Sequence, residues 1–128
     1  MKEKINLSEA EWKIMLKLWS LEPITIMQLT ASLKEETGWS KNTVITLLKR
    51  MEAKNAVAYV QGKRAKEYYA VLKREDAQIV ETRSFLRRIF NGSVGLMLNS
   101  MIEQNEISQD DLQEIQKILD RAEHENND

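Results

Sequence analysis

The chain contains no cysteine and only one histidine and one proline among its 128 residues. Without cysteine it forms neither disulfides nor thiolate metal sites, and this usage fits a reducing cytoplasm. With His124 as its only imidazole, it cannot build a histidine-based catalytic triad or a multi-histidine metal site. No nucleophile–base pair, phosphate loop or metal-ligand cluster is recognisable either. We therefore expect a protein that is not an enzyme and needs no cofactor and no metal.

The sequence also lacks any apolar run that approaches the roughly 18 residues needed to cross a bilayer. Its first residues, Met1–Asn6, contain no apolar segment of the kind found in signal peptides. Hydrophobic residues make up 42% and charged residues 30% of the chain, which is typical of globular proteins. We therefore expect a cytoplasmic protein with no membrane insertion.

The net charge of −1 hides an uneven distribution of charge. Between Lys41 and Lys66 the chain carries seven basic residues and one acidic residue, whereas Glu103–Asp128 carries nine acidic and two basic residues. A basic segment of this kind is typical of nucleic-acid contact. The acidic segment could bind a metal, but Asp110 and Asp111 fit better as charges at a helix N-terminus.

Two helices are predicted near the start of the chain, each begun by a capping box. Ser8 and Glu11 open a helix over about residues 8–20. We assign its apolar face to Trp12, Met15, Leu16 and Trp19. Thr25 and Gln28 open a second helix, which Gly38 ends. The N-terminus of this second helix could contact a phosphate through Thr25 and Gln28, although such residues more often serve only as caps.

A third helix is predicted over Lys41–Met51, behind the capping residue Ser40. Its inward face comprises Val44, Leu47, Leu48 and Met51. Its outward face comprises Lys41, Asn42, Thr43, Thr46, Lys49 and Arg50. Asparagine can pair with adenine, threonine methyls can touch thymine methyls, and lysine or arginine can reach guanine or phosphate. A solvated amphipathic face would show the same pattern, but the short helix before it and the basic segment after it favour DNA.

A β-hairpin is predicted after the third helix. Residues 57–61 and 67–72 are rich in β-forming side chains, and between them lies a turn over residues 62–66 with the basic residues Lys63, Arg64 and Lys66. As a wing, these three residues would meet phosphates or a minor groove, whereas taken alone they indicate charges that protect an edge hairpin from aggregation. Three helices followed by a basic hairpin is the order of a winged helix-turn-helix domain.

The second half of the chain is predicted to form three further helices, from about residue 74, from Val94 after Gly92, and from Ser108. About 50 residues make a thin core for a free-standing module, so we expect their apolar faces to be buried in a homodimer. The predicted interface comprises Leu86, Phe90, Val94, Met97, Leu98, Met101, Ile102, Leu112, Ile115 and Leu119. The predicted fold is therefore mainly α, with a winged helix-turn-helix domain over residues 1–73 and a three-helix dimerisation domain over residues 74–128.

Several stretches resemble the penicillinase repressor (BlaI/MecI/CopY) family. They are Ser8–Trp12, Trp39–Met51, Glu81–Leu86 and Phe90–Ser93, and they span nearly the whole chain. The resemblance implies a winged-helix N-terminal domain, a helical C-terminal dimerisation domain, and repression through an inverted-repeat operator in double-stranded DNA.

The resemblance also implies a way in which repression ends. In the β-lactam branch of the family, a membrane sensor-protease system leads to cleavage within the dimerisation domain, and the matching peptide bond here is Asn99–Ser100. The family usually has a bulky aromatic residue where this chain has Ser100. Asn99 and Ser100 lie outside the apolar stripe of their predicted helix, which comprises Val94, Met97, Leu98, Met101 and Ile102. Surface residues of a dimerisation helix that is not cleaved would show the same pattern. The copper-responsive branch ends in a cysteine cluster, which this chain lacks.

Two functions from different classes follow from this pattern. The first is a dimeric repressor that reads DNA with the helix at 41–51. The second is an adaptor that uses the same fold to bind proteins without specific DNA binding, because a fold does not fix a function. The two differ in their response to salt, since DNA binding weakens steeply as counterions are added.

Overall fold

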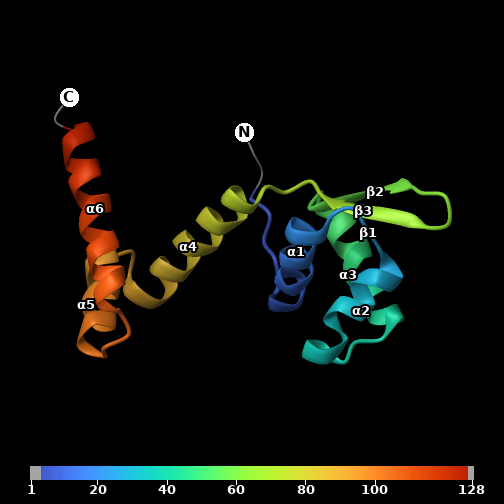
Figure 1. The fold of residues 1–128 in the computed structure, drawn as a ribbon, viewed down its shortest axis with the longest axis horizontal. Coiled ribbons are helices and arrows are strands. Elements are labelled where there is room, and N and C mark those ends of the chain that lie inside the picture. Colours follow the sequence, from blue (N-terminus) through green and yellow to red (C-terminus); the bar gives the residue numbers. More distant parts are fainter. Residues whose placement is uncertain (1–3, 127–128) are drawn as a thin grey trace. The chain divides into compact units, whose positions relative to one another are not determined.

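The computed structural model describes residues 4–126, which form six helices and three short strands (Figure 1). The chain divides into two compact units, Met1–Thr82 and Arg83–Asp128. Helix α4 (Arg74–Phe90) runs through this division. The mainly helical architecture with a small antiparallel sheet confirms the predicted fold class. The domain boundary expected at residues 73/74 lies at the start of α4 and stays a prediction.

The first unit contains the three predicted N-terminal helices, α1 (Glu9–Leu21), α2 (Ile26–Thr37) and α3 (Lys41–Ala53). Both predicted capping boxes are present: the Glu11 amide donates to Ser8 Oγ at 3.1 Å, and the Gln28 amide donates to Thr25 Oγ1 at 3.2 Å. Gly38 ends α2 in the left-handed conformation, at φ 68°. Local capping chemistry therefore sets the ends of these helices as the sequence predicts.

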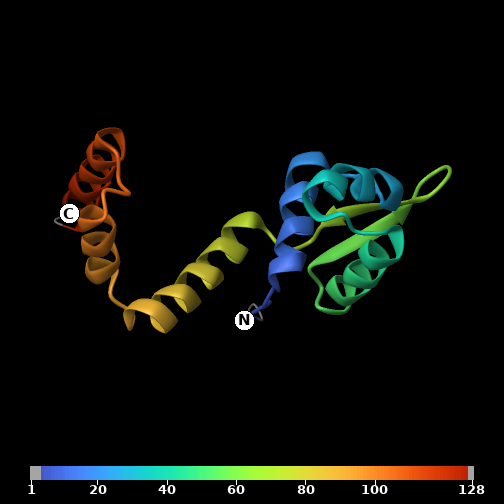
Figure 2. The same ribbon diagram turned by 90° about the horizontal axis from the view of Figure 1, so that it is seen from below.

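The sheet of this unit has three antiparallel strands in the order β1-β3-β2. The strands are β1 (Ile24–Thr25), β2 (Val57–Gln61) and β3 (Lys66–Ala70). The predicted hairpin is β2–β3, and it projects beyond the helices of its unit (Figure 2). Strand β1 was not predicted, because two residues are too short to show an alternating pattern. It pairs with β3 through Ile24 opposite Tyr68, which joins the start of α2 to the hairpin.

A single hydrophobic core joins the three helices to the sheet. Its largest members with almost no exposed surface are Ile14, Met15, Leu18, Leu29, Leu33, Val44, Leu48 and Met51. On α1 the buried stripe differs from the predicted one, because Leu16 is 49% exposed while Ile14 and Leu18 are fully buried. Trp12 and Trp19 are only partly buried and contact each other edge to face at 5.6 Å. The large rings thus lie beside the core, and smaller side chains fill it.

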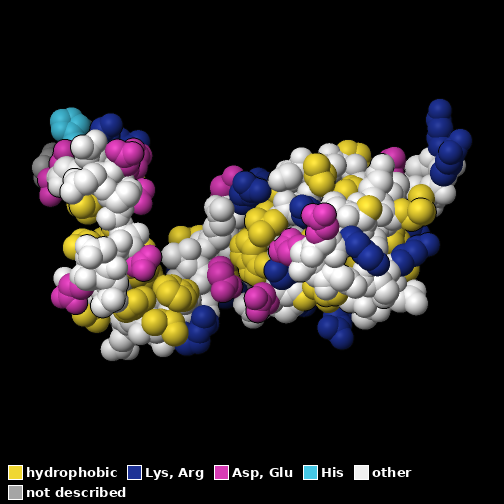
Figure 3. All heavy atoms as spheres, turned by 60° about the horizontal axis from the view of Figure 1, so that its bottom comes forward, with side chains coloured by type: hydrophobic (Ala, Val, Ile, Leu, Met, Phe, Trp, Pro, Cys, Tyr) yellow, Lys and Arg dark blue, Asp and Glu magenta, His cyan; other side chains and the backbone are white. Residues whose placement is uncertain are grey.

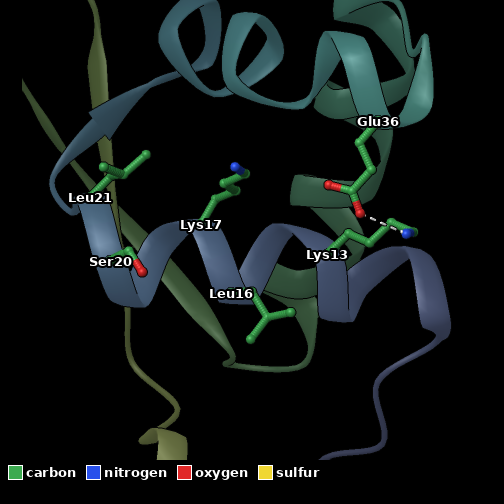
Figure 4. Close-up of a pocket in the computed structure, with 6 residues that line it drawn as sticks. All are labelled: Lys13, Leu16, Lys17, Ser20, Leu21 and Glu36. Atoms are coloured by element: carbon green, nitrogen blue, oxygen red, sulfur yellow. Dashed lines mark hydrogen bonds and ion pairs between the residues drawn. The ribbon is translucent and has the colours of Figure 1, made fainter.

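The exposed side of α1 forms a groove with α2 (Figure 4). Leu16 and Leu21 line it and are about half exposed. The Lys13 Nζ lies 2.9 Å from the Glu36 Oε1, which joins α1 to the last turns of α2. An ion pair in contact with solvent contributes little to stability. The buried apolar side chains therefore hold the two helices together.

The connection between β3 and α4 is fixed to the first unit by Trp19. Its indole N–H donates to the Leu72 carbonyl at 3.0 Å. The Arg74 guanidinium lies over the same ring, 5.4 Å from its centroid, in a cation–π contact. Ala77, in the first turn of α4, is buried. The start of α4 is thus part of the packing of this unit.

The second unit contains the end of α4 together with α5 (Val94–Glu103) and α6 (Gln109–Asn126). Ser93 and Ser108 cap these helices by accepting from backbone amides at 3.1 Å each. Within residues 83–126 no side chain is buried in the single chain, and Figure 3 shows hydrophobic side chains open to solvent in this region. The three helices therefore do not enclose a core of their own.

Two substitutions on α1 distinguish the observed core face from the predicted one. We expect Leu18→Ala to lower the free energy of unfolding by about 2–5 kcal/mol, because a fully buried leucine leaves a cavity. Leu16→Ala, the matched control on the exposed side, is expected to cost less than about 1 kcal/mol. Urea unfolding followed by circular dichroism measures both values. Equal losses would contradict the assignment of the core face.

Candidate nucleic-acid interface

Helix α3 presents an exposed polar face opposite its buried one. Val44, Leu47, Leu48 and Met51 are buried, as predicted from their spacing. The six residues predicted to face outward are all exposed: Lys41, Asn42, Thr43, Thr46, Lys49 and Arg50. Within residues 4–126, the side chains of Lys41, Asn42, Lys49 and Arg50 make no hydrogen bond or ion pair. Their donors are therefore free for an external ligand.

The threonines of this face are held by bonds within the helix. Thr46 Oγ1 donates to the Asn42 carbonyl at 3.0 Å, which commits the hydroxyl proton to the backbone. Ser40 Oγ accepts from the Thr43 amide and lies 3.2 Å from Thr43 Oγ1. A threonine bonded in this way has a restricted side chain, so its methyl group is presented in a defined position. Such a group suits contact with a thymine methyl.

The turn of the hairpin carries two of the three basic residues predicted for the wing, Lys63 and Arg64, whereas Lys66 belongs to strand β3. Both are exposed, and Figure 3 shows basic side chains gathered at the projecting end of the hairpin. The Gly62 amide donates to the Ala65 carbonyl at 2.9 Å and closes the turn. A Cβ atom at Gly62 would lie 2.7 Å from that carbonyl oxygen, so this close approach requires glycine. The turn thus presents its two cations on a tight backbone.

The base of the hairpin is joined to the end of α3. Tyr68 of β3 is buried, and its hydroxyl faces the Glu52 carboxylate of α3. Burial and the hydrogen bond between this hydroxyl and the carboxylate raise the pKa of Tyr68 to about 12. Tyr59 contacts the Tyr68 ring at 5.4 Å, and Lys66 Nζ lies 4.3 Å from the centroid of the Tyr59 ring. Lys66 therefore stacks on the hairpin itself. Tyr68 and Glu52 thus join the hairpin to the end of α3.

Lys54 differs from the basic residues on the exposed polar face of α3, because it is paired with an acidic residue of α1. Lys54 is the C-cap of α3, and its Nζ lies 2.7 Å from the Oε1 of Glu11 on α1. Counting charges along the sequence gives Lys54 the same weight as Arg50. The separation of 43 residues between the partners leaves no local signal for this pair.

Thr25 and Gln28, which were predicted to contact a phosphate at the start of α2, have a structural role in the chain. Thr25 and Gln28 each use a side-chain oxygen to cap the helix, with the Thr25 amide donating to Gln28 Oε1 at 3.0 Å. Thr25 also belongs to strand β1. A contact between this helix end and a phosphate stays a prediction.

The remaining predicted sites lie in the second unit. Asn99 and Ser100 are exposed in the middle of α5, and Asn99 Nδ2 donates to Glu103 Oε1 at 3.4 Å. The ten residues predicted for a dimer interface lie on the end of α4 and on α5 and α6, half-buried or exposed. Cleavage and self-association at these residues stay predictions.

Two further searches concern the described residues alone. Between residues 4 and 126, no three histidine, cysteine or acidic side chains are grouped closely enough to hold a metal ion. Over the same range, no helix is both long enough and apolar enough to cross a membrane.

The family model and the named sequence relatives agree on one family. The model of the family described as penicillinase repressor matches residues 7–121. A penicillinase repressor of Bacillus licheniformis is 29% identical over 126 residues, which cover 98% of this chain and 97% of that protein. The methicillin resistance regulatory protein MecI of Staphylococcus aureus (strain N315) is 22% identical over 116 residues, covering 91% of this chain and 94% of that protein.

A solved structure extends the likeness to a DNA complex. The monomeric form of Bacillus licheniformis BlaI, determined in complex with the blaP half-operator, matches with a TM-score of 0.52 and 26% sequence identity. The match covers 59% of this chain and 93% of that one. This likeness confirms the predicted winged-helix fold.

The exposed face of α3 yields a test with purified protein. We expect Arg50→Ala and Thr46→Ala each to weaken binding to a duplex selected from a randomised palindromic library by about five- to 100-fold, the range for removal of one base contact. Fluorescence anisotropy measures the affinities. Lys17→Ala, which removes a cation from the groove between α1 and α2, is the control and should leave the affinity within about twofold.

A salt titration of the same binding separates phosphate contacts from base contacts. The slope of log affinity against log salt is expected to be steep for the unaltered protein, and shallower by about one unit for each phosphate-binding cation that a substitution removes. Lys63→Ala and Arg64→Ala should reduce this slope if the hairpin turn meets phosphates. A flat response of the unaltered protein would contradict a nucleic-acid interface on this surface.

Proposed function

This chain belongs to the penicillinase repressor family, and from that premise we propose that it is a homodimeric transcriptional repressor that binds an inverted-repeat operator in double-stranded DNA. In this role it acts in the cytoplasm, without catalysis and without a cofactor. The observation that carries the proposal is the exposed face of α3, which lies opposite the buried apolar face of the helix. Side-chain donors that are unpaired among the described residues and the hydrogen-bonded Thr46 lie together on it.

Each group of this surface has a proposed role. Asn42 and Arg50 are suited to base edges, because an amide pairs with adenine and a guanidinium with guanine. Lys41 and the wing residues Lys63 and Arg64 are suited to phosphates, which position the protein without reading the sequence. Thr25 at the start of α2 is a further candidate for a phosphate. DNA as the partner is supported by a relative, since the monomeric form of Bacillus licheniformis BlaI was solved in complex with a half-operator.

The homodimer is supported by the apolar surface of the second unit. Its described residues leave no side chain buried, and Ile89, Val94, Leu96, Ile102 and Leu119 are about half exposed. Monomeric proteins rarely leave so much contiguous apolar surface in water. A second copy of the same helices would cover it with closed symmetry. Two reading helices about 34 Å apart would then meet successive half-sites on one side of the DNA.

Loss of the dimer is the proposed route to derepression. A repressor with two linked half-site contacts binds far more tightly than either half alone. We propose that a membrane sensor-protease system leads to cleavage at Asn99–Ser100, within one of the helices that carry the predicted interface. Proteases act on extended chain, so this segment of α5 must open locally before cleavage. Both residues are exposed, which supports access from solvent.

A protein-interaction adaptor is the second candidate, and one observation favours it. On the hairpin and after it, Val60, Tyr69 and Val71 are between about one third and one half exposed, which is the chemistry of a protein-binding surface. An adaptor would bind DNA weakly and without preference for a palindromic duplex. Binding to the selected duplex with a steep salt response excludes the adaptor as the sole function.

The dimer is tested with a charge placed on its predicted interface. We expect Leu119→Asp to shift the protein from dimer to monomer, because a buried, unpaired carboxylate is costly. Gln113→Asp, on a polar position of the same helix, is the matched control and should remain dimeric. Sedimentation velocity gives the two masses. A monomeric unaltered protein at micromolar concentration would contradict the proposal.

The cleavage switch has its own readout. In cells that carry a sensor-protease system and receive its inducer, we expect a fragment that begins at Ser100, detected by mass spectrometry of the recovered protein. Replacing Asn99 and Ser100 together by two lysines, which are good helix formers and keep α5 intact, should abolish the fragment and leave the target genes repressed. Induction with an intact chain would show that another signal relieves repression.

A further inference from the structure

We propose that the ion pair between Glu11 and Lys54 positions α3 for base reading, so that two residues that do not contact DNA determine how well the operator is recognised. This inference rests on the proposed function. It assigns Lys54 a role different from that of the other basic residues between 41 and 66.

The pair joins three segments that are far apart in the sequence. Lys54 Nζ donates to Glu11 Oε1 at 2.7 Å and to the Asn6 carbonyl at 2.9 Å. The same Glu11 Oε1 accepts from the Ser8 amide at 2.8 Å, within the capping box of α1. The end of α3 is thereby held to the start of α1 and to the segment before it.

The burial of Glu11 makes its carboxylate dependent on Lys54. Glu11 is 2% exposed, so burial raises the pKa of its carboxyl. The ammonium of Lys54 and the hydrogen bonds from Ser8 outweigh burial and hold the pKa below its usual value. Its second oxygen, Oε2, is buried and has no hydrogen-bond partner among the described residues. The carboxylate therefore depends on Lys54 for its charge compensation, and removing one partner of such a pair is costly.

Lys54 lies one turn after Arg50, which connects the pair to the reading face. The Lys54 amide donates to the Arg50 carbonyl at 3.2 Å, so both residues share the last turn of α3. On the hairpin side, Tyr68 faces Glu52 in the same turn. This turn is thus held from α1 and from the hairpin. Base contacts need the side chain placed accurately in the groove, and Arg50 lies in the turn that these two attachments hold.

The contacts of Lys54 argue against a phosphate contact for this residue. Its ammonium already donates to two acceptors, one of them a buried carboxylate. Turning Lys54 toward DNA would break both bonds and leave Glu11 charged and uncompensated. Lys49, exposed and unpaired among the described residues of the same helix, has no such cost and is the natural comparison.

The test uses the full-length protein with the selected palindromic duplex and a random duplex of equal length. Lys54→Met and Glu11→Leu each break the pair, Lys54→Arg keeps the cation, and Lys49→Met is the matched loss of charge. Circular dichroism and urea unfolding confirm that each variant is folded at the temperature of the binding assay. Anisotropy over a range of salt then gives affinity, selectivity and salt slope.

We expect Lys54→Met and Glu11→Leu each to lower the ratio of selected to random affinity at least about fivefold, as for a weakened base contact. Their salt slopes should equal that of the unaltered protein, whereas Lys49→Met should make the slope shallower if this residue meets a phosphate. Glu11→Leu is the decisive variant, because it removes a negative charge and simple electrostatics would strengthen DNA binding. Lys54→Arg should retain most of the selectivity, and the double variant should lose less than the two single losses combined.

Three outcomes would overturn the proposal. A shallower salt slope for Lys54→Met would show that Lys54 contacts phosphate. Unchanged selectivity in both pair-breaking variants would show that the pair only stabilises the fold. If the unaltered protein does not prefer the selected duplex to the random one, the proposed function itself fails, and this inference fails with it.

Discussion

The burial of one side of α3 is the constraint on which the rest of the first unit depends. Val44, Leu48 and Met51 lie in a core that α1, α2 and the sheet share, and this packing leaves the opposite face of the helix in solvent. The polar face is therefore a consequence of where the apolar side chains are buried. Capping by Ser40 fixes where the helix begins, so the order of side chains along the exposed face is set as well.

The second unit, by contrast, has no buried core among its described residues within the single chain. Its helices are well capped, yet in residues 83–126 they bury no side chain within the single chain. Regular local structure without an enclosed core needs a further surface to be stable in water. This contrast fits the proposed function, in which the first unit binds DNA and the stability of the second unit depends on a second copy of the chain.

Charge also has to be judged by what each residue contacts. The segment 41–66 is strongly basic, but its cations differ in availability. Lys54 is bonded to a buried carboxylate, and Lys66 lies over a tyrosine ring, while Lys63 and Arg64 project from a tight turn. A cation bonded to a buried partner is less available to an external ligand than one that projects into solvent. The net charge of a segment does not separate these two cases.

Sequence alone determined the helices, their caps, the hairpin and the exposed face of α3, because these depend on local spacing and local hydrogen bonds. The sequence analysis missed β1, whose two residues become a strand only by pairing with β3. It placed the core face of α1 on Trp12, Met15, Leu16 and Trp19, of which only Met15 is buried. Tertiary structure decided those features, since burial depends on which side chains fit between packed helices. It also decided the pairing of Glu11 with Lys54. Residues 43 positions apart meet only after the chain has folded, so no pattern along the sequence could indicate that the end of α3 is bonded to the start of α1.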